Sequence, residues 1–145
     1  MSKPPARSSV TRASPRPAPV PLLVVVDLLA LVVFVVTGLR SHHEGGAYAT
    51  IFLRNAVPLL GSWAIFSVVL GAYRYPGLGS MFRTWIVAVP VALVVRSLWV
   101  GSPTGVGRFL TFLAVGLAFT LLFLLIGRGL VALVTGRGYP HRRRP

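Results

Sequence analysis

The residue of this sequence best suited to chemistry is Asp27, a carboxylate inside an almost wholly apolar run from Val20 to Gly38. Placing a charged side chain in the hydrocarbon core of a bilayer costs about 2.5–3.5 kcal/mol on insertion scales. We therefore expect Asp27 to face other helices, near a cation, or to be protonated. Three roles stay open: a proton or cation relay or part of a solute pocket, a hydrogen bond or ion pair that locks helices, and a position close enough to the headgroups to reach water.

Arg96 is the natural partner for this carboxylate, because it also falls inside an apolar run. Counted from the same side of the membrane, helix rise puts Arg96 about 18 Å deep and Asp27 about 10 Å deep. An offset of about 8 Å is long for a direct ion pair, although an arginine side chain covers much of it. Arg96 could equally extend toward the outer surface, near Arg54 and Arg108. Asp27 and Arg96 form a candidate intramembrane polar site, and no bond between them is predicted.

A second group of polar residues follows the first apolar run, between Gly38 and Gly46. His42, His43 and Glu44 are adjacent, so their side chains point in different directions, and the chain has no cysteine to complete the coordination of a metal ion. We therefore expect no metal site. Arginines that converge beside histidines titrating near neutrality would suit an anion-binding or pH-sensitive loop. The alternative is structural, because cations are favoured at the C-terminal end of a helix. The candidate ligand cluster on this side consists of Arg40, Ser41, His42, Arg54 and Arg108.

The composition excludes most enzyme classes. The chain has 145 residues, no cysteine and only two acidic residues against 15 Lys and Arg, for a formal charge of +13. Cysteine nucleophiles and thiolate metal centres are excluded, and paired-carboxylate catalysis has almost no residues to use. No phosphate-binding loop or nucleophile elbow occurs. We therefore expect no catalytic site and no cofactor. We also expect no nucleic-acid partner, because the basic residues gather at membrane borders instead of on a folded face.

The elements that must position these residues are membrane-spanning helices. Hydrophobic residues make up 54% of the chain, in runs long enough at 1.5 Å per residue to cross a hydrocarbon core of about 30 Å. The runs lack the alternation of a β-barrel strand, and a cleaved signal peptide is disfavoured because the first run is long and three more follow. Within a membrane domain at 20–134, the expected spans are 20–38, 51–73, 84–100 and 107–134, with a disordered basic tail at 1–19 and a basic cytoplasmic tail at 135–145.

Charged and aromatic residues set the expected orientation. Of the 15 Lys and Arg, 11 fall on the side of both tails and of the connection between the second and third spans, while three fall on the other side. The positive-inside bias puts both termini in the cytoplasm, for a multi-pass protein of the cell membrane. Anionic lipid headgroups are the expected partners of the basic tails. The aromatic residues expected at the two interfaces are Tyr48, Tyr73, Tyr75, Trp85, Trp99 and Tyr139.

Small residues at helical spacing predict how the spans pack, because close backbone approach drives helix association in lipid. The expected packing residues are Gly61, Ala64, Ser67 and Gly71 in the second span, Ala88 and Ala92 in the third, and Gly116 and Thr120 in the fourth. Short connections make sequential helices antiparallel. The expected fold is therefore all-α, a polytopic membrane four-helix bundle.

A string of these residues resembles a known family. Asp27 inside the first span, then Gly38-x-Arg40-Ser41-His42-x-x-Gly45, with Arg96 late in the third span, is similar to the small membrane family catalogued as domain of unknown function 3054. The resemblance covers roughly Pro21 to Gly129 and leaves both basic tails outside. It implies four membrane spans and names candidate residues, and it implies no reaction.

Two functional hypotheses from different classes remain. One is a small transport or permeation protein, with Asp27 as its intramembrane polar element and the outer arginine and histidine cluster attracting anions. The other is a non-enzymatic accessory or assembly subunit of a membrane complex. Either protein could be a homo-oligomer or join a larger membrane assembly through its small-residue faces. Under the transport hypothesis, Asp27→Asn leaves assembly intact and abolishes flux in liposomes.

Overall fold

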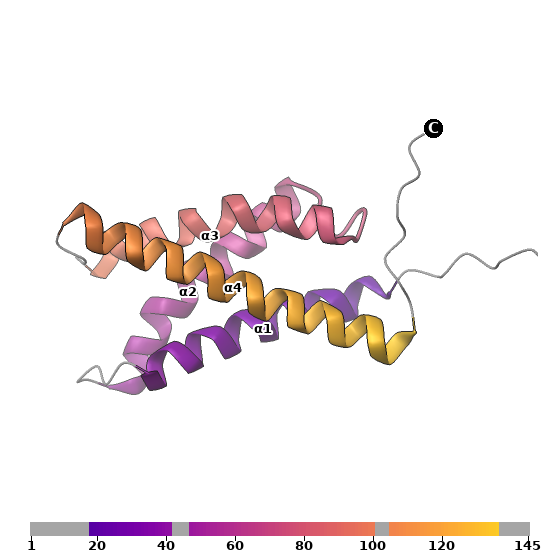
Figure 1. The fold of residues 1–145 in the computed structure, drawn as a ribbon, viewed down its shortest axis with the longest axis horizontal. Coiled ribbons are helices and arrows are strands. Elements are labelled where there is room, and N and C mark those ends of the chain that lie inside the picture. The colour runs from indigo at the N-terminus through magenta and orange to yellow at the C-terminus, as the bar shows by residue number, and fades with distance from the viewer. Residues whose placement is uncertain (1–17, 42–46, 101–104, 137–145) are drawn as a thin grey trace, which may run out of the picture.

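The computed structural model describes residues 18–41, 47–100 and 105–136, and over those residues it is helical, with no strand. The four helices are α1 (Val20–Ser41), α2 (Tyr48–Val69), α3 (Leu78–Val100) and α4 (Val106–Thr135). Figure 1 shows them packed as a bundle, with the start of α1 and the end of α4 at the same end. We name this end the terminal end. The other end, where α1 leads to α2 and α3 leads to α4, is the distal end.

Each helix is long and apolar enough to cross a membrane, with 22, 22, 23 and 30 residues from α1 to α4. At 1.5 Å per residue, 22 residues extend about 33 Å, which exceeds a hydrocarbon core of about 30 Å. The prediction of an all-α protein with four apolar spans is confirmed. Pro58 and Pro90 lie inside α2 and α3 without ending them, because neighbouring helices can satisfy the backbone groups that proline frees.

The helix boundaries differ most from the expected spans around the second connection. Helix α2 ends at Val69, before the expected residue 73, and α3 begins at Leu78, before the expected residue 84. Tyr73 therefore lies in the connection between two helices. Helix α1 continues past the expected residue 38 to Ser41 and so includes Arg40. The two tails expected at 1–19 and 135–145 fall almost entirely outside the described residues.

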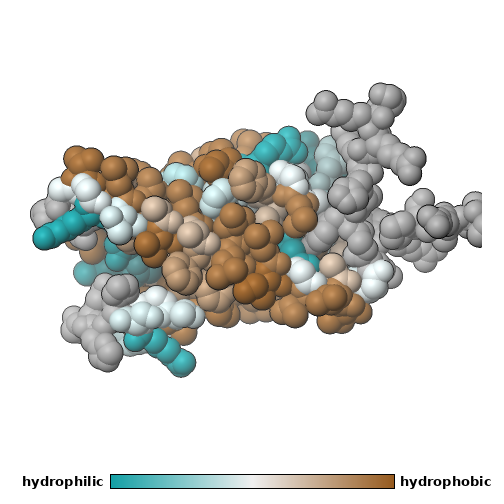
Figure 2. Space-filling view, in the orientation of Figure 1, coloured by the Kyte–Doolittle hydropathy of each residue, from teal (hydrophilic) through white to brown (hydrophobic). Residues whose placement is uncertain are grey.

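The contacts arrange the helices as two pairs. Helix α2 packs most extensively on α3, and α1 on α4, while fewer contacts join α1 to α2 and α3 to α4. The core between them holds large fully buried side chains: Leu23, Leu31, Trp63, Met81, Val89 and Leu124. Apolar side chains cover the middle of the face seen in Figure 2, and hydrophilic ones gather toward its ends. This distribution is the one a bilayer requires, since the lipid-facing surface must be as apolar as the core.

Glycines allow the closest approaches of α4 to its neighbours. A Cβ atom on Gly127 would lie 2.8 Å from Val26 Cγ1 of α1, and one on Gly116 would lie 2.8 Å from Leu93 Cδ1 of α3. Both distances are shorter than real contacts allow, so a side chain at either position would force the neighbouring side chain to shift. The predicted packing role of Gly116 and Thr120 is thus confirmed, and Thr120 is fully buried.

The packing prediction is confirmed for α3 and partly wrong for α2. Ala88 and Ala92 of α3 are buried, but Gly61 and Ala64 of α2 are exposed. Helix α2 turns the adjacent face, which carries Trp63, toward the core instead.

Trp85 corrects another expectation, because it is not an interfacial anchor. Since α3 begins at Leu78, Trp85 lies about two helical turns inside the helix. Its side chain is buried, and its indole Nε1 donates a hydrogen bond to Thr120 Oγ1 of α4 at 3.1 Å. Trp85 therefore joins α3 to α4, whereas Trp99 is exposed, as expected of an interfacial residue.

Candidate functional site

Asp27 of α1 forms a bidentate ion pair with Arg128 of α4. Arg128 Nη2 donates to Asp27 Oδ2 at 2.6 Å, and Arg128 Nε donates to Asp27 Oδ1 at 2.9 Å. Both side chains are 0% exposed. Bidentate pairing of a guanidinium with a carboxylate gives short, directional hydrogen bonds, which is the geometry that a buried ion pair needs to offset the loss of water.

The connection between α2 and α3 completes this polar network. The Tyr73 hydroxyl donates to Asp27 Oδ2 at 2.9 Å and accepts a hydrogen bond from Trp63 Nε1 at 3.1 Å. Arg128 Nη1 donates to the Gly77 carbonyl oxygen at 2.9 Å. Burial, followed by the negative charge of Asp27, raises the pKa of Tyr73, which lies outside the four helices, to about 12. The phenol therefore keeps its proton and stays a donor to the carboxylate.

Local hydrogen bonds fix the connection that carries Tyr73. The Ser67 carbonyl accepts the Ala72 N–H at 2.9 Å at the point where the chain leaves α2, and Gly71 takes a φ of 63° there. A positive φ is a conformation that glycine adopts at little cost. The Ser80 hydroxyl donates to the Ala72 carbonyl oxygen at 3.1 Å and accepts the Gly77 N–H at 3.2 Å. The network thus ties α1 and α4 to both ends of the α2–α3 connection.

Sequence reasoning missed Arg128, which falls near the end of the expected fourth span at 107–134. A signal was nevertheless present. Asp27 lies seven residues after the first residue of α1, and Arg128 lies seven residues before the last residue of α4. Helix rise therefore puts both about 10 Å from the terminal end. Of the three roles left open for Asp27, the observed geometry matches the ion pair that locks helices.

The candidate partner Arg96 lies elsewhere in the bundle. It is eighteen residues from the start of α3, or about 27 Å along the helix. Asp27 lies near that start instead, because its partner Arg128 also bonds Gly77, the residue before α3. Arg96 Nε donates to Asn55 Oδ1 of α2 at 2.6 Å, and its guanidinium carbon lies 4.9 Å from the centroid of the Phe112 ring. The structure therefore does not bring Asp27 and Arg96 together.

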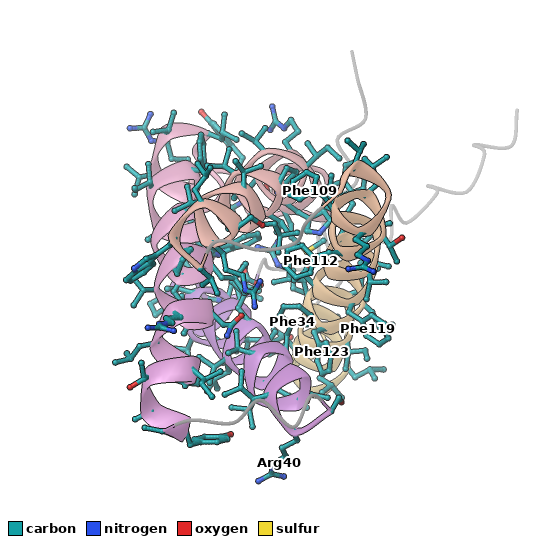
Figure 3. All side chains as sticks on the ribbon, turned by 90° about the vertical axis from the view of Figure 1, so that its left-hand side faces the viewer. Phe34, Arg40, Phe109, Phe112, Phe119 and Phe123 are labelled. Atoms are coloured by element: carbon teal, nitrogen blue, oxygen red, sulfur yellow. The ribbon has the colours of Figure 1, made fainter. Side chains whose placement is uncertain are left out.

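Arg96 instead lines a cavity of about 690 Å³ in the distal half of the bundle. Ser41, Gly107 and Arg108 mark its mouth at the distal ends of α1 and α4, and Phe34 and Phe123 lie at its deeper end. The rings of Phe34 and Phe123 pack edge to face with centroids 6.3 Å apart. In Figure 3, which looks into the bundle from the distal end, Phe34, Phe112 and Phe123 point into the space between the helices.

The structure brings together part of the predicted outer cluster. Ser41 and Arg108 line the cavity along with Arg96. Arg40 and Arg54 are exposed and do not line it, and Arg40 points away from the bundle in Figure 3. His42 lies outside the described residues. Sequence reasoning missed Asn55 and the phenylalanines of the cavity, because an apolar wall cannot be told from ordinary core residues by composition.

No group of three potential metal-ligating side chains occurs within the part of the chain that the structure describes. The polar groups that converge in it are those of the buried network at the terminal end and those around Arg96. The four apolar helices make the chain a multi-pass membrane protein, and its described residues hold a buried ion pair toward one end and a cavity of about 690 Å³ toward the other.

Comparison with known proteins extends the resemblance seen in the sequence. No curated protein and no solved structure matches the chain. The family described as protein of unknown function (DUF3054) matches residues 24–131, which contain Asp27, Arg128 and the whole wall of the cavity. The match covers most of the chain, and the protein therefore belongs to the DUF3054 family.

Proposed function

We propose that this protein is a small, non-enzymatic transport protein that receives its solute in the distal cavity. The cavity volume of about 690 Å³ carries this proposal. Pockets that hold small organic molecules have volumes of about 300–1,000 Å³, and they are mostly apolar with a few placed polar groups. The wall fits that description, because its side chains are mostly aromatic and aliphatic and its polar groups are few, among them the hydrogen-bonded pair Arg96 and Asn55.

The contrast between the two ends of the bundle supports transport over simple storage. Toward the terminal end, a buried ion pair joins Asp27 to Arg128, and the Tyr73 hydroxyl donates to the same carboxylate. At the distal end, the helices separate around the cavity. A bundle that is open at one end and closed by an ion pair at the other has the form of a transporter loaded from the open side. In this proposal Asp27 closes the path and does not relay protons.

The orientation belongs to the same proposal. The excess of Lys and Arg in the two tails and in the α2–α3 connection favours a cytoplasmic terminal end in the cell membrane. The distal cavity then faces the outside. Solute would enter from outside and leave toward the cytoplasm when the terminal network opens, or move in the opposite direction by the same steps.

Cysteine labelling tests this proposal without knowledge of the solute. The chain has no cysteine, so each variant carries one thiol. Ala92→Cys places it on the cavity wall, and Val91→Cys places it at the same depth on the exposed face of α3. A membrane-impermeant thiosulfonate is added to sealed vesicles from one face at a time. Transport predicts that Ala92→Cys reacts from both faces, because the cavity opens alternately, and that Val91→Cys reacts from neither.

Reaction of Ala92→Cys from the distal face alone would contradict transport. That result would favour the alternative hypothesis, a non-enzymatic accessory or assembly subunit of a membrane complex. A cavity thiol that reacts from neither face would also contradict transport.

A further inference from the structure

The wall of the distal cavity combines aromatic rings with a positive charge. Four phenylalanines line it: Phe34, Phe112, Phe119 and Phe123. Two arginines also line it, Arg96 within the wall and Arg108 at the mouth, and no acidic side chain among the described residues does so. Rings of this kind pack with an apolar or aromatic body, and arginines attract oxygen anions.

The Arg96 guanidinium is held in place by its neighbours. Asn55 Nδ2 donates to the Ile51 carbonyl oxygen at 2.8 Å, which leaves its Oδ1 pointing at Arg96. Arg96 Nε donates to that oxygen at 2.6 Å, and the guanidinium lies 4.9 Å from the Phe112 ring centroid. The amide and the ring hold the guanidinium at the cavity wall, so less freedom is lost when it binds an anion.

The polar and apolar parts of the wall lie at different depths. Arg108 and Ser41 lie at the mouth, and Arg96 lies one turn from the distal end of α3. Phe123 lies fifteen residues further along α4 than Arg108, or about 22 Å by helix rise. A ligand that satisfies both parts must therefore have a charged head toward the mouth and an apolar body that extends inward.

We infer that the cavity binds amphipathic organic anions, with a carboxylate, sulfonate or phosphate head at Arg96 and Arg108 and a single hydrocarbon or aryl body among the phenylalanines. This assignment rests on the proposed function, because it names the class of solute that the transporter would take. The same chemistry could come from a free organic acid or from an anionic lipid of the bilayer.

A matched pair of probes tests the assignment directly. The probes are 3-phenylpropane-1-sulfonate and 3-phenylpropan-1-ol, which share an aryl body and differ in charge. Binding to the full chain in phosphatidylcholine nanodiscs is measured by calorimetry, with empty nanodiscs as the blank. The sulfonate should bind about tenfold more tightly than the alcohol, because charge-assisted hydrogen bonds to arginine exceed those to a neutral hydroxyl. Arg96→Gln should remove this preference and leave alcohol binding within about twofold.

A pair of glycine variants locates the binding in the cavity. Gly38 lines the cavity and a Cβ there would meet nothing within 4 Å, so the Gly38→Leu side chain starts in open space at the cavity wall. Gly61 of α2 is equally open but lies on an exposed face. Gly38→Leu should weaken binding of both probes, and Gly61→Leu should change neither. Equal effects of the two variants, or equal affinities of the two probes for the parent protein, would overturn the assignment.

Nanodiscs with phosphatidylglycerol separate the two sources of the anion. Weaker sulfonate binding in these discs would identify an anionic lipid as an occupant of the same site, and unchanged binding would favour a free organic acid. The labelling and binding experiments also fail independently. Sulfonate binding with one-sided labelling would overturn transport alone, and two-sided labelling without sulfonate preference would overturn the ligand class alone.

Discussion

The two ends of this bundle each place an arginine between helices, in different surroundings. At the terminal end, Arg128 is 0% exposed and meets a carboxylate, so the charges neutralise each other in a packed site. At the distal end, Arg96 is half-buried beside a neutral amide and a ring, with a cavity of about 690 Å³ next to it. The comparison teaches that the role of an arginine between membrane helices depends on the chemical type of the group that it contacts. The carboxylate of Asp27 neutralises Arg128 inside the packed bundle, whereas the amide of Asn55 orients Arg96 at the wall of the cavity.

The largest effect expected from this comparison comes from breaking the terminal ion pair. Arg128→Gln leaves the Asp27 carboxylate buried without its counter-ion, and removing one partner of a buried pair costs about 3–5 kcal/mol. We expect strong loss of thermal stability in mild detergent, measured by size-exclusion chromatography after heating. The same argument applies to Asp27→Asn, so this variant should lose assembly as well as any flux, unlike the expectation from sequence alone.

The double variant Asp27→Asn with Arg128→Gln is the control for that prediction. It removes both charges together, so it should recover much of the stability that either single variant loses. If the double variant is no more stable than the singles, the two residues do not act as a pair.

The next largest loss of stability is expected from removing the Tyr73 hydroxyl, which the α2–α3 connection supplies. Tyr73→Phe removes the hydrogen bond to the Asp27 carboxylate and the acceptor of the Trp63 Nε1–H, and it leaves the ring in place. Hydrogen bonds to charged groups contribute about 1.5–3 kcal/mol, so the same heating assay should show a clear but smaller loss. Tyr48→Phe, on an exposed residue, should change stability by less than about 0.5 kcal/mol. Equal losses in the two variants would show that the phenol does not support the network.

A comparable effect should follow from separating α1 and α4 just beside the ion pair. Gly127→Ala places a Cβ 2.8 Å from Val26 Cγ1, next to Asp27 in the chain, and overpacking of this kind costs about 1–3 kcal/mol. Gly129→Ala, two residues further along α4, meets nothing within 4 Å and should be neutral or stabilising. Equal stability of the two variants would mean that the helices do not approach closely here.

The smallest effect on stability is expected at the distal end. Arg96→Gln removes a half-buried group beside a cavity, so we expect a change below about 1 kcal/mol in the heating assay together with loss of anion preference. A loss as large as that of Arg128→Gln would assign Arg96 to the structural core and erase the difference between the two ends.

The fold was predictable because its signal is spread over whole segments. Long apolar runs require helices in lipid, and four such runs gave the spans without knowledge of any contact. Helix ends were less accurate where composition changes gradually. Leu78 to Arg83 carries glycine, serine and arginine, so the start of α3 could not be told from a connection.

The candidate site was only partly predictable because pairing depends on which helices are neighbours. Asp27 was identified from its cost in lipid, but choosing between Arg96 and Arg128 required knowing that α1 packs on α4. The cavity left no sequence signal, since Phe112 and Phe123 are as suited to a core as to a binding wall. Only equal distances of Asp27 and Arg128 from the terminal end pointed to the correct pair.

The most direct test of the account is the rate at which a membrane-impermeant thiosulfonate modifies Ala92→Cys from the distal face, with and without 3-phenylpropane-1-sulfonate. The account predicts ready modification that the sulfonate slows and 3-phenylpropan-1-ol slows much less, while Val91→Cys stays unreactive throughout. A thiol at residue 92 that reacts no faster than one at residue 91, or one that the sulfonate does not protect, would contradict it.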